Sequence, residues 1–130
     1  MRVIEKQMIE AIKDRRPWKS GNTEVSLCRR EDDKPLARIY LHGNHIATVG
    51  YASDQPAGDF EVTNLSVSLA GWNTPTTRSR LTALCQTFTR CNGVRTCKGV
   101  AGLVYAKTIT GEWRVEPVIQ PITNSQWIEV

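Results

Sequence analysis

Residues 37–51 read ARIYLHGNHIATVGY and predict a β-hairpin. Ala37, Ile39 and Leu41 alternate with polar or amphipathic residues, which is the period of a strand with one buried face. Gly43-Asn44 is a two-residue turn signal, because both residue types tolerate a positive φ. Residues 46–51 return as the partner strand. The hairpin predicts a sheet of neighbouring antiparallel strands.

The segment before the hairpin predicts one strand and one helix. Residues 23–28 alternate apolar and polar side chains, as a half-buried strand does. Residues 1–15 predict an amphipathic helix, which Pro17 ends because a proline disfavours helix at the residue before it. Residues 15–21 then form a basic connector. The apolar positions at helical spacing are Met1, Ile4, Met8 and Ile12.

The segment after the hairpin predicts a strand and later a second hairpin. Residues 60–69 read as a strand, with a bulge near Thr63-Asn64 because the apolar alternation shifts there by one residue. Residues 99–107 and 112–119 predict a closing hairpin. The tail, residues 121–130, is expected to be irregular or an edge strand.

A central helix is predicted to start at Thr74. Threonine suits the N-cap, and Pro75 suits the first helical position. We expect the helix to end at Asn92-Gly93, because Asn and Gly are favoured just past a helix end. Its apolar face consists of Thr77, Leu81, Leu84, Cys85 and Phe88.

The elements predict the α+β class, with an antiparallel sheet of about five to six strands. An N-terminal amphipathic helix and one central helix would pack on a face of the sheet. The length predicts a single domain over residues 1–130. Within it, residues 1–20 form the helix and connector, residues 21–120 the core and residues 121–130 the tail.

Positive charge is concentrated in the middle of the chain. The formal net charge is +4, but residues 62–111 contain no Asp or Glu. Such asymmetry indicates an anionic partner, although carboxylates folded nearby, such as those of residues 31–33, would also balance it. The basic residues of this segment are Arg78, Arg80, Arg90, Arg95, Lys98 and Lys107.

The sequence indicates neither an enzyme nor a cofactor or metal site. It has no phosphate-binding glycine motif, no nucleophile elbow and no zinc-protease motif. Cys85, Cys91 and Cys97 are spaced six apart, which is not zinc-ligand spacing, and a mixed site with His42 and His45 lacks standard spacing too. We expect core thiols at Cys28 and Cys85 and loop thiols at the other two cysteines.

No membrane or secretion signal is recognisable. No apolar run reaches the length that spans a bilayer, and residues 1–13 mix charges among their apolar residues. We therefore expect a cytoplasmic protein without a membrane partner, and an oligomeric state that the sequence leaves open.

The start of the central helix is the candidate anion site. Helix N-termini favour anions, yet Arg78 and Arg80 occupy the first turns, where acidic residues are the usual choice. A phosphate between guanidinium groups and hydroxyls would compensate both charges. An internal salt bridge to a carboxylate is the alternative. The predicted anion site comprises Thr74, Thr76, Thr77, Arg78, Ser79 and Arg80.

Further residues extend this site as a nucleic-acid surface. Arg90, Arg95 and Lys98 would enlarge the basic patch, and Trp18 would stack on bases, as aromatic side chains do in single-strand binders. Trp18 and Trp127 are expected to be exposed. We expect the other two tryptophans, Trp72 and Trp113, to be core residues.

Three segments carry a recognisable pattern: NTEV at residues 22–25, LHGNHIA at residues 41–47 and GWNTPTTRSRLTAL at residues 71–84. Together they resemble a group of short tailed-bacteriophage proteins without an assigned biochemical function. The resemblance covers roughly residues 21–84. It implies a small phage-made protein that acts inside a bacterium, and it supplies no catalytic residues.

The sequence thus predicts a non-enzymatic phage accessory protein. The first hypothesis is binding of nucleic acid, single-stranded or duplex, through phosphate contacts with weak sequence specificity. The alternative is an inhibitor of a host protein or host defence complex. A third hypothesis is a self-associating structural component, supported only by the edge strands.

Overall fold

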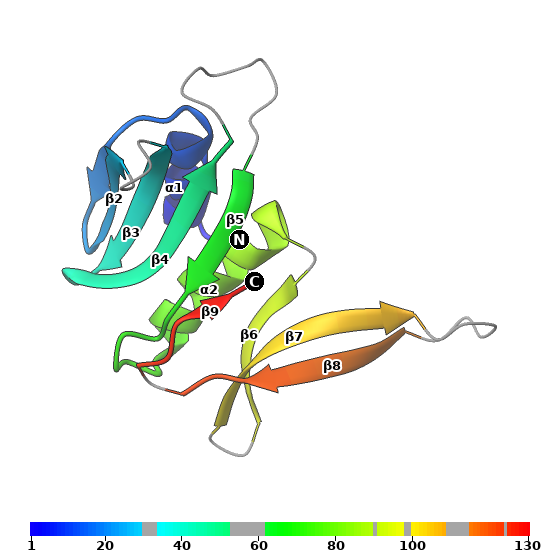
Figure 1. Cartoon of the computed structure of the whole chain (residues 1–130). Helices are drawn as coiled ribbons and strands as arrows, with labels where there is room; N and C mark the ends of the chain where they lie inside the picture. Colours follow the sequence, from blue (N-terminus) through cyan, green and yellow to red (C-terminus); the bar gives the residue numbers. More distant parts are fainter. Residues whose placement is uncertain (30–33, 53–61, 90, 98–99, 109–114, 124) are drawn as a thin grey trace.

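Two antiparallel sheets and two helices make up the described part of the chain (Figure 1). The computed structural model describes residues 1–29, 34–52, 62–89, 91–97, 100–108, 115–123 and 125–130. The helices are α1 (Val3–Lys13) and α2 (Pro75–Phe88). The larger sheet has the order β1 (Trp18–Ser20), β2 (Thr23–Arg29), β3 (Pro35–Leu41), β4 (Asn44–Tyr51), β5 (Val62–Val67) and β9 (Ile128–Glu129). The smaller sheet contains β6 (Cys91–Cys97), β7 (Val100–Thr108) and β8 (Val115–Pro121).

The β3–β4 hairpin is confirmed, with its turn one residue earlier than predicted. Leu41 pairs with Asn44, so His42 and Gly43 are the two turn residues. Their φ angles are 51° and 77°, and two consecutive positive φ values are what a type I′ turn requires. The prediction of Gly43-Asn44 as the turn was wrong because Asn44 already pairs as the first residue of β4.

The predicted bulge in β5 is also confirmed. Tyr51 pairs with Val62 and Gly50 with Asn64, so Thr63 is the extra residue. The inserted residue moves the apolar positions after it onto the same face as those before it.

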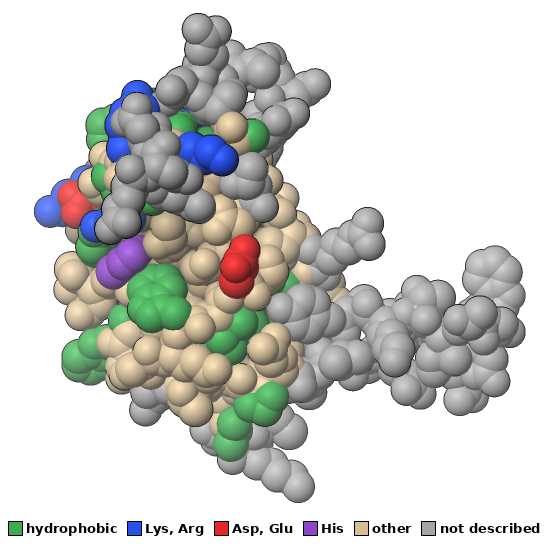
Figure 2. Space-filling model, in the orientation of Figure 1, with side chains coloured by type: hydrophobic (Ala, Val, Ile, Leu, Met, Phe, Trp, Pro, Cys, Tyr) green, Lys and Arg blue, Asp and Glu red, His purple; other side chains and the backbone are tan. Residues whose placement is uncertain are grey.

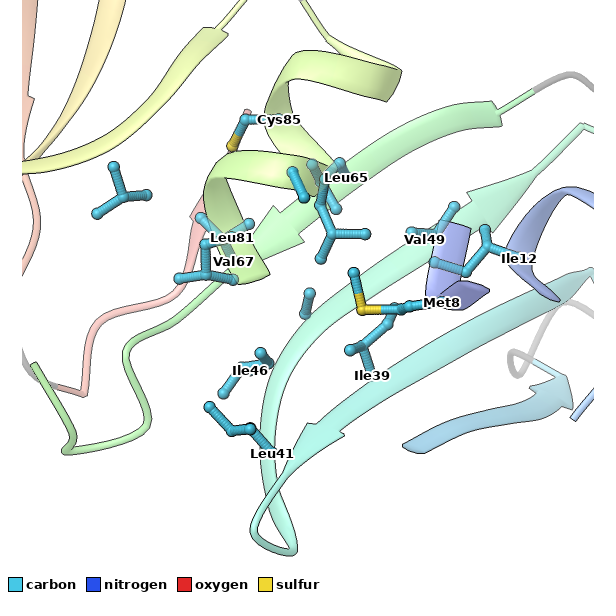
Figure 3. Packing of buried hydrophobic residues seen from close by; sticks show 14 of the residues in the cluster. Met8, Ile12, Ile39, Leu41, Ile46, Val49, Leu65, Val67, Leu81 and Cys85 are labelled. Carbon is cyan, nitrogen blue, oxygen red and sulfur yellow. The ribbon is translucent and has the colours of Figure 1, made fainter. Parts of the chain in front are cut away.

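One face of the larger sheet is covered and the other is open. Figure 1 shows α1 and α2 on the same side of the sheet, behind it in this view, while no helix covers the side turned to the viewer. The core lies between the sheet and these helices. Figure 3 shows it as a continuous row from Met8 of α1, through Ile39 and Leu65 of the sheet, to Leu81 of α2. The predicted α+β class, sheet size and helix placement are therefore confirmed.

The connector after α1 differs from the prediction. Residues 18–20 are not a basic connector but strand β1, in which Trp18 pairs with Val25. Trp18 is half-buried and packs against the core, so the prediction that it is exposed was wrong. Burying part of a large apolar ring lowers the free energy of the folded protein relative to leaving the ring in water.

Helix α2 begins as predicted and ends earlier. The Thr77 N–H donates to Thr74 Oγ1 at 3.2 Å, which confirms the N-cap. The prediction that the helix ends at Asn92-Gly93 was wrong, because Thr89 is extended and Cys91–Cys97 forms β6. The Thr89 hydroxyl donates to the Cys85 carbonyl at 2.7 Å and accepts the Cys91 N–H at 2.9 Å, so this one side chain helps to end the helix and start the strand.

The closing hairpin is confirmed as β7 and β8, but it joins β6 in a separate sheet. Figure 1 shows this hairpin reaching away from the larger sheet. The tail forms the edge strand β9: Ile128 pairs with Val67, and the Val130 N–H donates to the Leu65 carbonyl at 2.8 Å. Of the two states predicted for the tail, residues 128–129 adopt the edge strand.

Candidate nucleic-acid interface

The predicted anion site is largely occupied by internal bonds. Arg80 Nη1 donates to Glu5 Oε2 at 2.7 Å, and Arg80 Nε donates to Thr23 Oγ1 at 3.1 Å. The Ser79 hydroxyl donates to the same Glu5 oxygen at 2.6 Å. The side chains of Arg80 and Glu5 are only 4% and 3% exposed. Arg80 thus makes the internal salt bridge that was the alternative, and it is not open to a phosphate from solvent.

Glu5 is held in its charged form by these partners. Burial raises the pKa of a carboxyl group, but hydrogen bonds from Ser79, from the Arg2 N–H and from Arg80 outweigh it, so the pKa of Glu5 lies below its usual value. A charged Glu5 compensates the positive charge of Arg80 near the start of α2, whose first turn has no acidic residue.

The hydroxyl groups of this site serve mainly as a cap. Thr74 Oγ1 accepts the Thr77 N–H and lies 2.9 Å from Thr77 Oγ1. Pro75 has no N–H to offer a ligand. Thr76 is half-buried, and its hydroxyl has no hydrogen-bond partner within the described part of the chain.

The other predicted contact residues are spread over the fold. Arg78 is half-buried, and its Nη1 donates to both oxygens of Asn73, at 3.1 Å and 2.5 Å. Arg95 is exposed on β6. Arg90 and Lys98 lie outside the described residues. The structure therefore gathers the α2 residues of the prediction but does not gather Trp18 with them.

The open face of the larger sheet carries aromatic rings that sequence reasoning did not select. The ring centroids of Tyr40 and His45 lie 5.3 Å apart, and those of His45 and Trp127 lie 4.6 Å apart. We call these three residues the ring cluster. Figure 2 shows a histidine beside exposed hydrophobic side chains on this face. Trp127 is 45% exposed, as predicted, so the cluster offers an accessible ring to a ligand.

A second bulge places the ring cluster. Ile39 pairs with Ala47 and Tyr40 with His45, so Ile46 is the extra residue of β4. The bulge sets His45 directly opposite Tyr40 and lets Ile46 enter the core. No single stretch of sequence contains all three rings, which explains why a local pattern did not reveal them.

The surroundings of His45 favour its uncharged form. Its Nε2 lies 2.9 Å from the Ala47 carbonyl oxygen and 2.8 Å from the Thr48 hydroxyl. Burial lowers the pKa of His45 below its usual value, and the positive charge of Arg38 adds to this effect, while the Ala47 carbonyl opposes it. A neutral imidazole stacks on a base without desolvating a charge.

Charged residues border the rings in two rows across the sheet. Cross-strand pairing places Lys19 beside Glu24 and Glu24 beside Tyr40. In the next row Arg38 pairs with Thr48, and Arg38 is exposed. Arg38 lies two residues before Tyr40 on β3, so it is on the same face of the sheet as the rings. Glu129, on β9, adds a negative charge to the edge of this face.

A groove lies at the end of the β3–β4 hairpin, and we call it the hairpin groove. Its volume is about 430 Å³, and Leu41, Ile46 and Leu69 form an apolar floor. Trp72 lines it and is 58% exposed, so the prediction of Trp72 as a core residue was wrong. The physical reason is the turn at Ala70 and Gly71, with φ of 52° and 84°, which directs the chain out of the core. Trp113 lies outside the described residues.

The cysteines form no metal site among the described residues. No group of three or more His, Cys, Asp or Glu there could hold a metal ion. Cys91 is buried beside Cys85, so its prediction as a loop thiol was wrong, while Cys85 is a core thiol as predicted. The hydrogen bond from the Cys85 thiol lowers the pKa of Cys91 to about 7, and the same contact raises the pKa of Cys85.

None of the described helices combines the length and apolar character needed to cross a membrane. A family model described as Kyanoviridae Gp96 protein matches residues 1–120. No curated protein and no solved structure matches the chain. The family match includes residues 22–25, 41–47 and 71–84, on which the phage resemblance was based.

Proposed function

The chain belongs to the Kyanoviridae Gp96 family of bacteriophage proteins, and from this premise we propose that it binds single-stranded nucleic acid. In this proposal it acts without catalysis, in the cytoplasm of the host bacterium, and with weak sequence specificity. The observation that carries the proposal is the ring cluster on the open sheet face, with Arg38 on the same face. Exposed aromatic rings on a surface that also carries cations are a means by which proteins hold unpaired bases.

Stacking on the ring cluster would supply most of the affinity. Each base stacked on an aromatic side chain contributes about 1–3 kcal/mol. Trp127 offers the most exposed ring, and His45 is neutral, so both can cover a base without losing a hydrated charge. Bases in a duplex present edges and not faces, so this surface favours a single strand over a duplex.

Phosphate contacts would come from Arg38 and Lys19, which lie on the same face as the rings. Glu24 and Glu129 reduce the positive potential there. We therefore expect modest affinity and a shallow salt dependence, because few counterions are released. Arg78 and Arg95 remain accessory phosphate contacts in the proposal, whereas Arg80 and Ser79 bind Glu5.

The test is fluorescence anisotropy of labelled single-stranded and duplex DNA and RNA, at low and at near-physiological salt. We expect saturable binding to single strands. Trp127→Ala should weaken the affinity for single strands by about 5- to 100-fold, since the substitution removes the ring on which one base stacks. Arg38→Ala should weaken binding to all sequences and reduce the slope of log affinity against log salt by about 1.

Two exposed residues on other surfaces provide matched controls. Val100→Ala removes an exposed apolar side chain from β7, and Lys6→Ala removes an exposed charge from α1. Both should bind single strands like the unmodified protein. Absence of saturable binding at low salt would refute the proposal, as would equal affinity of the Trp127→Ala and Val100→Ala variants.

One observation favours the alternative function, inhibition of a host protein or defence complex. Trp72 is 58% exposed, and exposed tryptophans are frequent centres of protein interfaces. If no strand binds, affinity capture from host lysate with the unmodified protein and with Trp72→Ala tests this alternative. A host protein retained only by the unmodified protein would support it.

A further inference from the structure

We propose that the hairpin groove is a base-recognition site, which takes one unpaired nucleobase of a bound strand. The inference extends the proposed function, because the base belongs to the strand that crosses the ring cluster. It concerns a different surface, formed by the β3–β4 turn and by residues 69–77.

The shape of the groove suits a small ring. Its volume of about 430 Å³ falls in the range of small-molecule sites. Leu41, Ile46 and Leu69 are all buried, so the floor is fixed by the core. A planar ring inserted against this floor gains the hydrophobic contribution of burial without moving the backbone.

The wall of the groove is an aromatic ring on a fixed backbone. The Trp72 N–H donates to the Leu69 carbonyl at 2.8 Å, and the Trp72 carbonyl accepts the Thr74 N–H at 3.0 Å. These two bonds hold the main chain, while the indole stays exposed. A nucleobase that stacks on the indole would cover it on the groove side.

The rim carries hydrogen-bonding groups without internal partners. Asn44 and Thr76 line the groove and are half-buried. Within the residues that the structure describes, neither side chain makes a hydrogen bond. An amide donates and accepts, and so does a hydroxyl, which matches the mixed donors and acceptors on the edge of a base. Solvent satisfies these half-buried groups in the free protein, and the polar edge of a bound base would replace that water.

The groove favours a neutral ligand. Its lining residues include His42 but no Lys, Arg, Asp or Glu. The start of α2 offers few free donors to an anion, because Pro75 has no N–H and the Thr77 N–H is bonded to Thr74. A nucleobase is uncharged at neutral pH, and its phosphate would stay outside in solvent. These features favour a neutral ring over a phosphate as the group that enters the groove.

The groove adjoins the ring cluster around one strand end. Asn44 and Ile46 line the groove, and His45, between them on β4, contacts Trp127 on the open face. Because Ile46 faces the core side of the sheet and His45 the open side, a strand stacked on the ring cluster would have to turn around the end of the β3–β4 hairpin to reach the groove. One base can turn into it while its neighbours stay on the rings, as in proteins that splay single-stranded bases apart.

The first experiment uses the four free ribonucleosides, which carry no phosphate, and the full chain labelled with ¹⁵N. The indole N–H signal of Trp72 is assigned with the Trp72→Phe variant. We expect one or two nucleosides to shift this signal saturably and the others to shift it less. Thr76→Val should weaken the affinity for the preferred nucleoside by about 3- to 10-fold, because the substitution removes one hydrogen bond and leaves the side-chain volume nearly unchanged.

The second experiment compares four homopolymeric single strands. Trp72→Ala should reduce the affinity for the preferred homopolymer by about 5- to 100-fold, so that the variant binds all four homopolymers with similar affinity. Trp127→Ala is the matched control, because it should weaken all four homopolymers alike. Trp72 is exposed, so its replacement should leave the fold intact, which the thermal midpoint verifies.

The outcomes separate the groove from the proposed function. If nucleosides move the Trp72 signal but no strand binds, the strand-binding proposal fails and the base site stands. If strands bind and no nucleoside moves the Trp72 signal, the base site is refuted and strand binding stands. If nucleosides have no effect and Trp72→Ala abolishes capture of a host protein, the groove is a protein site and the inference is overturned.

Discussion

Glu5 is a buried carboxylate that connects three elements. It lies on α1, binds Arg80 and Ser79 of α2, and reaches β2 through the bond from Arg80 to Thr23. An ion pair of this kind contributes little over apolar residues, but removing one partner leaves a buried charge. We expect Glu5→Gln to lower the free energy of unfolding by about 3–5 kcal/mol, measured by urea unfolding.

The control for this substitution is Glu10→Gln, on the exposed side of the same helix. It should change the free energy of unfolding by less than about 0.5 kcal/mol. Similar effects of the two substitutions would mean that the Arg80–Glu5 contact does not stabilise the fold.

Glu5 also predicts the acid response of the protein. Its pKa in the folded chain lies below the usual 4.5, so the folded state binds this proton less readily than the unfolded chain. The stabilisation is therefore present above about pH 4.5 and is lost as the pH falls through the folded-state pKa. Glu5→Gln should lose less stability than the unmodified protein between about pH 5 and about pH 2, as urea midpoints at several pH values would show. Equal losses in both proteins would contradict this.

At the scale of elements, β6 is held against α2 by a glycine contact. Gly93 has a φ of 129°, and a Cβ there would lie 2.5 Å from Thr82 Cγ2. The Thr82 hydroxyl also accepts the Val94 N–H at 3.0 Å. We expect Gly93→Ala to destabilise the protein by about 1–3 kcal/mol through overpacking, in addition to the backbone strain. Thermal or urea unfolding measures this.

Gly43→Ala is the matched comparison, because Gly43 also has a positive φ but no atom near its Cβ position. It should show the backbone strain alone, about 1–2 kcal/mol. If both variants lose the same stability, the contact with Thr82 is not a constraint on β6.

The elements were predictable where the pattern is local. The β3–β4 hairpin, the bulge at Thr63 and the cap at Thr74 follow from residues that are adjacent in sequence. The end of α2 could not be predicted in this way, because Asn92-Gly93 is a helix stop signal and is also part of a strand that packs on Thr82. A tertiary contact decided between the two.

At the scale of the whole molecule, the site was less predictable than the fold. The charge distribution along the sequence predicted that an anion lies near Arg80. It could not show whether this anion is a phosphate or the carboxylate of Glu5, which is far away in sequence. The ring cluster combines β3, β4 and the segment before β9, so no single window contains it. The prediction of one domain over residues 1–130 stays a prediction.

The strand order of the larger sheet has a consequence for how the chain folds. Strands β1 to β5 pair in the order of the sequence, so each pairing closes only a short loop and can form early. The exception is β9, which reaches β5 from far along the chain. We expect β9 to dock after the rate-limiting step: Ile128→Ala should speed unfolding and leave the refolding rate nearly unchanged in stopped-flow measurements, whereas Ile39→Ala should slow refolding. A slower refolding rate in Ile128→Ala would mean that the distant strand helps to nucleate the sheet.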